Sequence, residues 1–179
     1  MSILPNYLAC IKLHLQHHSP PQVIDHVILT TQTAVSISKK LKALFPKINC
    51  QLILAGAMLH DIGRSKSHNV DHGIIGGEII KQHGFPVELV HIVENHIFAG
   101  VLKDEAAEFG LPTREYLPNT IEEKIVSYSD NISKNIQILS REEVLNYFSK
   151  YLERNHPVLK RINELHKEIE VYLKRTRSG

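Results

Sequence analysis

The segment AGAMLHDIGR, residues 55–64, begins as an apolar helical run and ends in the adjacent pair His60 and Asp61. Gly63 follows closely and is typical of the end of a helix. An apolar helix buries its side chains, and a buried carboxylate beside a buried imidazole is costly unless a partner satisfies both. Because neutral imidazole and carboxylate are ligands of divalent metal ions, this pair suggests a metal site.

The composition fits one globular domain. The 179 residues are 42% hydrophobic, which is enough for one core, so we expect residues 1–179 to form a single domain. The 21 basic and 19 acidic residues give no concentrated basic charge, so nucleic acid is not expected as a partner. No apolar run approaches the roughly 18 residues of a membrane span, and the start lacks an export signal. We therefore expect a cytoplasmic protein, and the sequence leaves its oligomeric state open.

Helical periodicity dominates the chain, and no convincing strand pattern is present, so the sequence predicts an all-α fold. In the first helix the spacing of Leu8, Ile11 and Leu15 predicts an apolar inward face. Residues 99–118 look irregular except for a short helical piece at about 103–109, and such long segments often cover a site. The expected helices run over about residues 5–18, 21–45, 49–61, 72–83 and 86–97, and further helices open at Thr120, Ser140 and Pro157.

One expected helix contains two adjacent glycines. Gly76 and Gly77 lie inside the helix that Asp71 should cap, and each costs roughly 1 kcal/mol there relative to alanine. The pair suggests close packing of the backbone against a neighbouring element, although a kink would also explain it.

Four possible metal ligands lie on separate expected helices. His26 lies in the first turns of the long helix, His60 and Asp61 end the next one, and Asp130 follows within Tyr128-Ser129-Asp130-Asn131. A helical bundle can direct such side chains to one point, as bundles do when they build metal sites.

This order of residues resembles the HD-domain superfamily of metal-dependent phosphohydrolases, whose defining ligands are His, then His-Asp, then Asp. The resemblance covers residues 22–135, which we expect to form the core of an HD-type helical bundle with flanking terminal helices. It implies that His26, His60, Asp61 and Asp130 hold a metal ion.

A second metal ion is implied by the same resemblance. Some members carry two further histidines between the doublet and the last aspartate, and the aspartate of the doublet then bridges two ions. His72 and His96 are similar in placement to those ligands, and His68 competes with His72 for the role. The sequence therefore leaves open whether one or two ions bind.

The expected chemistry follows from this ligand set. Nitrogen and carboxylate ligands suit iron, manganese, zinc, cobalt or nickel without selecting among them. Two ions bridged by Asp61 could lower the pKa of a water, and the resulting hydroxide would attack phosphorus. Arg64 and Lys66 follow the doublet and are placed to neutralise phosphate charge, unless they belong to a solvated basic loop. Lys134 would share a helix face with Asp130 if that helix continues.

The sequence thus predicts a metal-dependent phosphohydrolase that uses a metal-activated hydroxide. Its substrate would be a phosphomonoester, phosphodiester or phosphoanhydride of a nucleotide or a similar small metabolite. The alternatives are a module that binds metal and nucleotide without turnover, a di-iron HD oxygenase, and a helical interaction protein with incidental histidines. No motif in the chain identifies the substrate.

Overall fold

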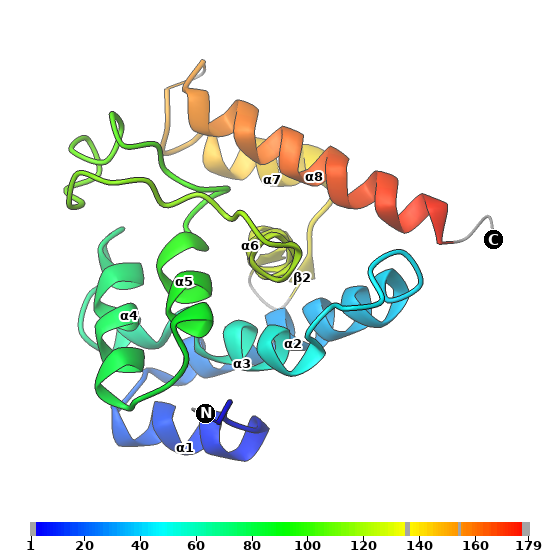
Figure 1. Ribbon diagram of the computed structural model, residues 1–179. Coiled ribbons are helices and arrows are strands. Elements are labelled where there is room, and N and C mark those ends of the chain that lie inside the picture. Colours follow the sequence, from blue (N-terminus) through cyan, green and yellow to red (C-terminus); the bar gives the residue numbers. More distant parts are fainter. Residues whose placement is uncertain (1–2, 135–136, 154, 177–179) are drawn as a thin grey trace.

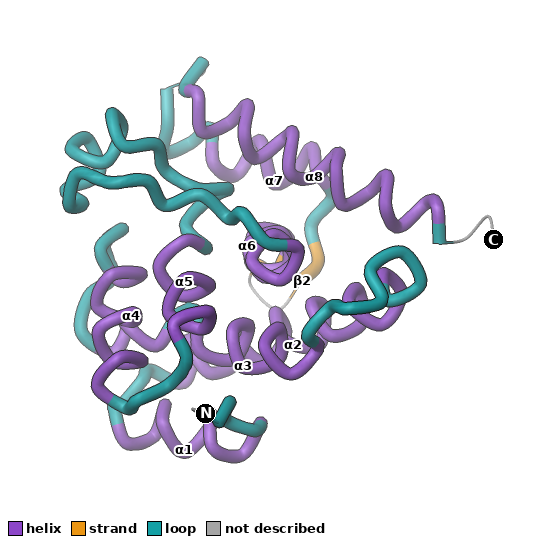
Figure 2. The backbone as a smooth tube through the Cα atoms, viewed as in Figure 1, coloured by secondary structure: helices purple, strands orange, loops and turns teal. Residues whose placement is uncertain are grey.

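The fold is described by a computed structural model for residues 3–134, 137–153 and 155–176. Within these residues the chain is helical, as expected, with one short antiparallel hairpin that the sequence did not predict (Figures 1 and 2). None of the described helices combines the length and apolar character that a membrane span requires. The elements are α1 (Tyr7–Gln16), α2 (Pro21–Leu41), α3 (Cys50–Leu59), the 3₁₀ helix η1 (Ile62–Ser65), α4 (His72–Gln82), α5 (Val87–Asn95), α6 (Ile121–Ile132), β1 (Ser133–Lys134), β2 (Gln137–Ile138), α7 (Arg141–Phe148) and α8 (Pro157–Arg175).

The helix α6 lies at the centre of the molecule. Figure 1 shows it end-on, with α2 and α3 on one side, α5 beside it, and α7 and α8 on the opposite side. Thr120 caps its first turn by accepting a hydrogen bond from the backbone N–H of Glu123. Its side chains Ile125 and Val126 are fully buried, so the helix that carries Asp130 is fixed by contacts on several faces.

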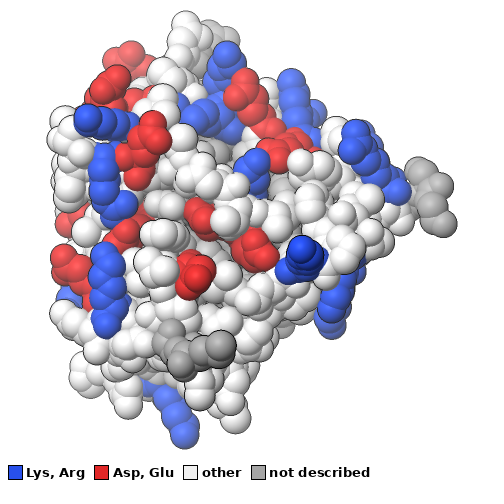
Figure 3. Space-filling view, in the orientation of Figure 1, with Lys and Arg blue, Asp and Glu red and all other residues white. Residues whose placement is uncertain are grey.

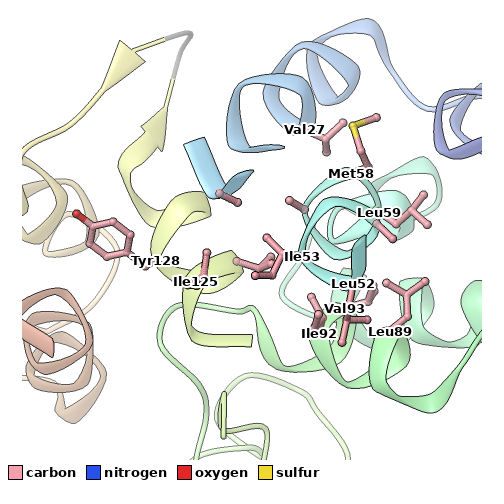
Figure 4. Close-up of a cluster of buried hydrophobic side chains, with 14 of the residues drawn as sticks. Val27, Leu52, Ile53, Met58, Leu59, Leu89, Ile92, Val93, Ile125 and Tyr128 are labelled. Atoms are coloured by element: carbon pink, nitrogen blue, oxygen red, sulfur yellow. The ribbon is translucent and has the colours of Figure 1, made fainter. Parts of the chain in front are cut away.

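The helix α3 is apolar on all sides and lies in the core. Its residues Ile53, Met58 and Leu59 are fully buried, and Figure 4 shows them between side chains of α2, α5 and α6. A helix that is hydrophobic all round is stable only when it is surrounded by protein. Since His60 and Asp61 follow directly at its end, this packing brings both polar side chains into the interior.

Close helix packing explains the paired glycines of α4. A Cβ atom at Gly76 would lie 2.7 Å from Cγ1 of Val93, and one at Gly77 would lie 2.5 Å from Cγ of Glu94. Only glycine leaves room for α5 at these positions. The expectation of close backbone packing is confirmed.

The predicted inward face of the first helix is wrong. Leu8 and Leu15 are 67% and 60% exposed, whereas Cys10, Leu13 and His14 are buried. His14 occupies the centre of the buried face, with Nδ1 2.8 Å from Ser19 Oγ and Nε2 2.7 Å from Met58 O. The hydrophobic pattern misplaced this face because its central side chain is a histidine that is buried and hydrogen-bonded.

Three other local expectations need correction. The second helix ends at Leu41 and not near residue 45, because a turn precedes Pro46. Asp71 does not cap α4 with its side chain, since it accepts a hydrogen bond from Ser67 Oγ at 2.5 Å. Residues 103–109 form turns and not a helix.

The irregular segment at residues 99–118 has its own small core. Its apolar side chains Val101, Ala106, Leu111 and Tyr116 form a second buried cluster with Ile97, and a bridge pairs Val101 with Tyr116. The segment contributes no lining residue to the hollows described below, so it does not cover the site in the way the sequence suggested.

Candidate metal centre

Side chains from three parts of the chain meet at one point beneath the molecular surface. His26 of α2, His60 at the end of α3 and Asp130 of α6 form the first group. Nε2 of His26 lies 2.9 Å from Asp130 Oδ1 and 3.2 Å from Nε2 of His60. Nε2 of His60 lies 3.6 Å from the same Oδ1 atom. The three helices therefore bring together the residues that the sequence placed 104 positions apart.

A second pair of histidines lies on the other side of Asp61. His72 begins α4 and His96 follows α5, and their Nε2 atoms are 3.1 Å apart. Oδ1 of Asp61 lies 3.0 Å from Nε2 of His72 and 3.6 Å from Nε2 of His96. Its other oxygen, Oδ2, lies 3.7 and 3.8 Å from Nε2 of His26 and His60. The two oxygens of one carboxylate thus face two separate groups of histidines.

The orientation of three of these imidazole rings is set by backbone carbonyl groups. For His60 and His96 these carbonyls lie in the last turns of α3 and α5, where helical partners are lacking, whereas the acceptor of His72 lies just before α4. His60, His72 and His96 each direct Nδ1 to the carbonyl oxygen three residues earlier, which makes Nδ1 the protonated nitrogen. The acceptors are Ala57, Asn69 and Val93, at 2.8, 2.6 and 2.7 Å respectively. Each Nε2 atom therefore presents a lone pair to the centre.

These lone pairs fit a bound cation. Burial lowers the pKa of His96, so its ring is neutral near pH 7. The Nε2 atoms of His72 and His96 lie 3.1 Å apart, and the buried Oδ1 of Asp61 makes no hydrogen bond. Buried polar atoms of this kind require a partner, and a divalent metal ion satisfies imidazole and carboxylate together. The donor set therefore suits iron, manganese, zinc, cobalt or nickel and contains no thiolate.

Both central carboxylates are ionised at neutral pH. Burial alone would raise the pKa of Asp61, but the neighbouring His60 holds it well below its usual range. Burial would likewise raise the pKa of Asp130, but the ammonium group of Lys134 and two histidines hold it well below its usual range. Both carboxylates are therefore available as anionic donors.

An open hollow of about 610 Å³ gives access to this centre. Arg64 lines it and donates from Nε to Asp61 Oδ2 at 2.7 Å. Lys134 lines it too and donates from Nζ to Asp130 Oδ1 at 3.1 Å. Two cations thus stand between the carboxylates and the solvent, where an anionic ligand would enter.

The chain matches a known family over more than half of its length. Residues 23–135 match the HD domain family. This chain is an HD domain protein. An uncharacterized protein of Methanocaldococcus jannaschii is 40% identical over 85% of this chain and 90% of its own length. A tRNA (cytidine(56)-2′-O)-methyltransferase of Thermoplasma volcanium is 37% identical over 93% of this chain, which spans only 47% of that enzyme.

A further relative and a solved structure of similar fold carry phosphodiesterase names. The dihydroneopterin 2′,3′-cyclic phosphate phosphodiesterase of Methanocaldococcus jannaschii is 27% identical over 69% of this chain and 51% of its own length. The HD domain of the phosphodiesterase PgpH of Listeria monocytogenes, crystallised with cyclic-di-AMP, has a TM-score of 0.54 at 16% identity. That alignment covers 90% of this chain and 94% of the other, and it shows a shared fold. Family membership supports a metal-dependent phosphohydrolase.

The remaining residues singled out in the sequence of this HD domain protein lie outside the group of metal-facing donors. His68 is exposed and lines the hollow, so His72 and not His68 faces His96. Lys66 is exposed and does not line the hollow. Its charge acts instead on His17, whose pKa is lowered first by burial and then by His83 and Lys66.

Sequence patterns gave little or no indication of two residues that line the hollow. Lys134 reaches Asp130 although α6 has already ended at Ile132, because the hairpin turns its side chain back over the site. Tyr147 of α7 lines the same hollow, although it lies outside the HD match. No local pattern marks Tyr147, since its position depends on how α7 packs over the centre.

Proposed function

We propose that this HD domain protein is a metal-dependent phosphohydrolase that cleaves phosphate esters of nucleotides or similar small metabolites, above all phosphodiesters. The observation that carries the proposal is the placement of Asp61, whose two oxygens face His26 and His60 on one side and His72 and His96 on the other. A carboxylate in that place can be shared by two metal ions.

In this proposal two groups of residues hold the metal ions. His26, His60 and Asp130 would hold one, His72 and His96 would hold the other, and Asp61 would contribute to both. Divalent ions there would supply an acidified water and polarise a phosphoryl oxygen. Binding and orientation of the substrate would depend on the side chains that line the hollow.

The cationic side chains bind and orient the phosphate group. Nε of Arg64 donates to Asp61 Oδ2, and the Arg64 side chain is 31% exposed and lines the hollow. The ammonium group of Lys134 lies on the opposite carboxylate, Asp130. A phosphate between the two would receive charge-assisted hydrogen bonds from both, and these become stronger as negative charge develops on its oxygens.

Phosphodiesters are favoured by two adjoining hollows, whose linings share Arg64, Asp130 and Lys134. One hollow of about 610 Å³ extends past Gln22 and Asp25 of α2. A second, of about 140 Å³, extends past His72 and Phe98. A diester needs room for a group on each side of phosphorus, whereas a monoester needs room on one side only. The name of the cyclic phosphate phosphodiesterase among the relatives is consistent with this choice.

The test is hydrolysis by the purified protein loaded separately with manganese, iron, cobalt, nickel or zinc. The panel contains nucleotides, cyclic nucleotides, dinucleoside polyphosphates and sugar phosphates. Asp61→Ala should lose metal and activity, and it should lose more metal than His96→Ala. Equal metal content in these two variants would contradict the shared role of Asp61.

A second variant separates phosphate binding from metal binding. Arg64→Ala should keep the metal and the fold but lower kcat/KM roughly ten- to a hundredfold, the effect of one charge-assisted contact. Lys66→Ala is the matched control, because Lys66 is exposed outside the hollow. Equal losses in both variants would indicate a general charge effect and no specific contact.

Two of the three alternatives make different predictions for the same preparations. A binding module would hold nucleotide and metal but release no product with any metal. A di-iron oxygenase would consume oxygen, and its electron spin resonance would change after exposure to oxygen. Either result, together with no hydrolysis across the panel, would refute the phosphohydrolase.

A further inference from the structure

A separate hollow of about 290 Å³ lies beyond Lys134 and Tyr147, away from the metal-facing donors. It is formed by the β-hairpin and α7, and its lining includes Gln137 and Asn146. Lys134 and Tyr147 line both this hollow and the larger one over the centre. A ligand whose phosphate lies at the centre can therefore extend past these two side chains.

The size of the two hollows indicates a ligand much larger than a phosphate group. Pockets of roughly 300–1,000 Å³ bind ligands of drug size. The hollow over the centre, at about 610 Å³, lies in that range before the neighbouring space is added. The part of the substrate that is not phosphate thus has room beside the centre.

The wall between the hollows is aromatic and cationic. The Lys134 ammonium lies 6.0 Å from the centre of the Tyr147 ring, and the ring of Tyr151 lies 5.5 Å from that of Tyr147. Val144 and Phe148 make the buried contacts of α7, whereas Tyr147 is half-buried. Tyr147 is thus available to a planar ligand, with a cation for phosphate beside it.

The far side of the wall offers hydrogen-bonding groups. Gln137 and Asn146 are exposed and line the smaller hollow, and each side-chain amide can both donate and accept. Stacking on an aromatic ring with amide hydrogen bonds to the edge is how proteins bind unpaired nucleobases.

We propose that Tyr147, Gln137 and Asn146 form a nucleobase subsite, which makes the substrate a nucleoside phosphate ester. The base stacks on Tyr147, and the phosphate passes Lys134 to reach the centre. This assignment of substrate class rests on the proposed phosphohydrolase function. The subsite lies outside the segment that matches the HD domain family, so it belongs to the C-terminal part of this chain.

The test measures binding without turnover. The ligands are the 5′-methylenephosphonate of adenosine and the matching phosphonate of ribose, whose carbon–phosphorus bonds are not esters. Calorimetry on the metal-loaded protein should give tighter binding for the adenosine compound. Tyr147→Leu should weaken that binding between about fivefold and a hundredfold, the effect of losing one base–aromatic stack. Tyr147→Phe should restore it, and the ribose compound should change by less than about twofold.

Tyr7→Leu is the matched control, since Tyr7 is an exposed tyrosine of α1 outside all of these hollows. Equal binding of both phosphonates to the unaltered protein, or equal weakening of both by Tyr147→Leu, would overturn the subsite. If Tyr147→Leu does not fold, the exposed pair Gln137→Ala and Asn146→Ala tests the same point, and unchanged adenosine binding would overturn it. A protein that binds the base through Tyr147 but cleaves no ester would refute the hydrolysis and leave the subsite standing.

Discussion

Replacing His166 should change how the stability of this protein depends on pH. His166 of α8 is fully buried, with its ring centre 4.7 Å from that of Tyr128 on the central helix α6. Neither of its ring nitrogens has a hydrogen-bond partner. Burial, with a smaller contribution from the positive charge of Arg141, lowers its pKa to about 4. The contact between α6 and α8 therefore requires a neutral imidazole.

The magnitude follows from this pKa. An unfolded histidine has a pKa of 6.5, so the difference from about 4 is roughly 2.5 units, or about 3 kcal/mol at 1.36 kcal/mol per unit. Between these values the unfolded chain binds a proton at His166 and the folded chain does not. The free energy of unfolding therefore has its full value above about pH 6.5, and it decreases by about 3 kcal/mol as the pH falls to about 4.

The variant His166→Leu removes this dependence and keeps an apolar contact. Urea unfolding followed by circular dichroism, at several values between about pH 7 and pH 4, gives the difference between the two chains. The free energy of unfolding of the variant, relative to that of the unaltered protein, should increase as the pH falls. His91→Gln, which removes an exposed imidazole of α5, controls for the loss of a histidine. Both chains need the same metal content, since metal binding itself depends on pH. A difference that stays constant with pH would refute the reasoning.

Three other changes test the centre and its supports. Gly63→Ala should lower the free energy of unfolding by roughly 1–3 kcal/mol or more in thermal unfolding, because its Cβ would lie 1.9 Å from the carbonyl oxygen of His72; an unchanged midpoint would contradict this packing. The double variant His72→Ala, His96→Ala should keep about one metal per chain and lose most hydrolysis. If its metal content equals that of the unaltered protein, these two histidines hold no second ion and the centre is mononuclear. Lys134→Met should keep the metal and lower kcat/KM roughly tenfold or more for every phosphate substrate, and full activity would exclude phosphate contact.

Much of the helical framework was predictable because its signals are local. Asn49, Thr120 and Ser140 each cap the helix that follows, and each cap joins atoms only three residues apart. The apolar run before His60 predicted burial, and α3 is indeed enclosed by protein. The order His26, His60-Asp61, Asp130 was sufficient to indicate the HD domain family, which the match over residues 23–135 confirms.

Other features depended on contacts between distant segments. The inward face of α1 was misjudged because His14 is buried through a hydrogen bond to Met58, 44 residues away. A hydrophobicity pattern counts histidine as polar, so only the packed structure shows which side of the helix faces inward. The paired strands Ser133–Lys134 and Gln137–Ile138 were missed, since strands of two residues leave no alternating pattern.

The sequence by itself identified the side chains that could bind metal, because their type and order along the chain carry that information. Tertiary structure decided how Asp61 divides its oxygens between two groups of histidines and that His72, not His68, faces His96. It also brought Lys134 back onto Asp130 and placed Tyr147 beside the centre. These relations join residues far apart in the chain, and no spacing specifies them. They arise only when α6 and the helices around it pack at fixed distances and angles.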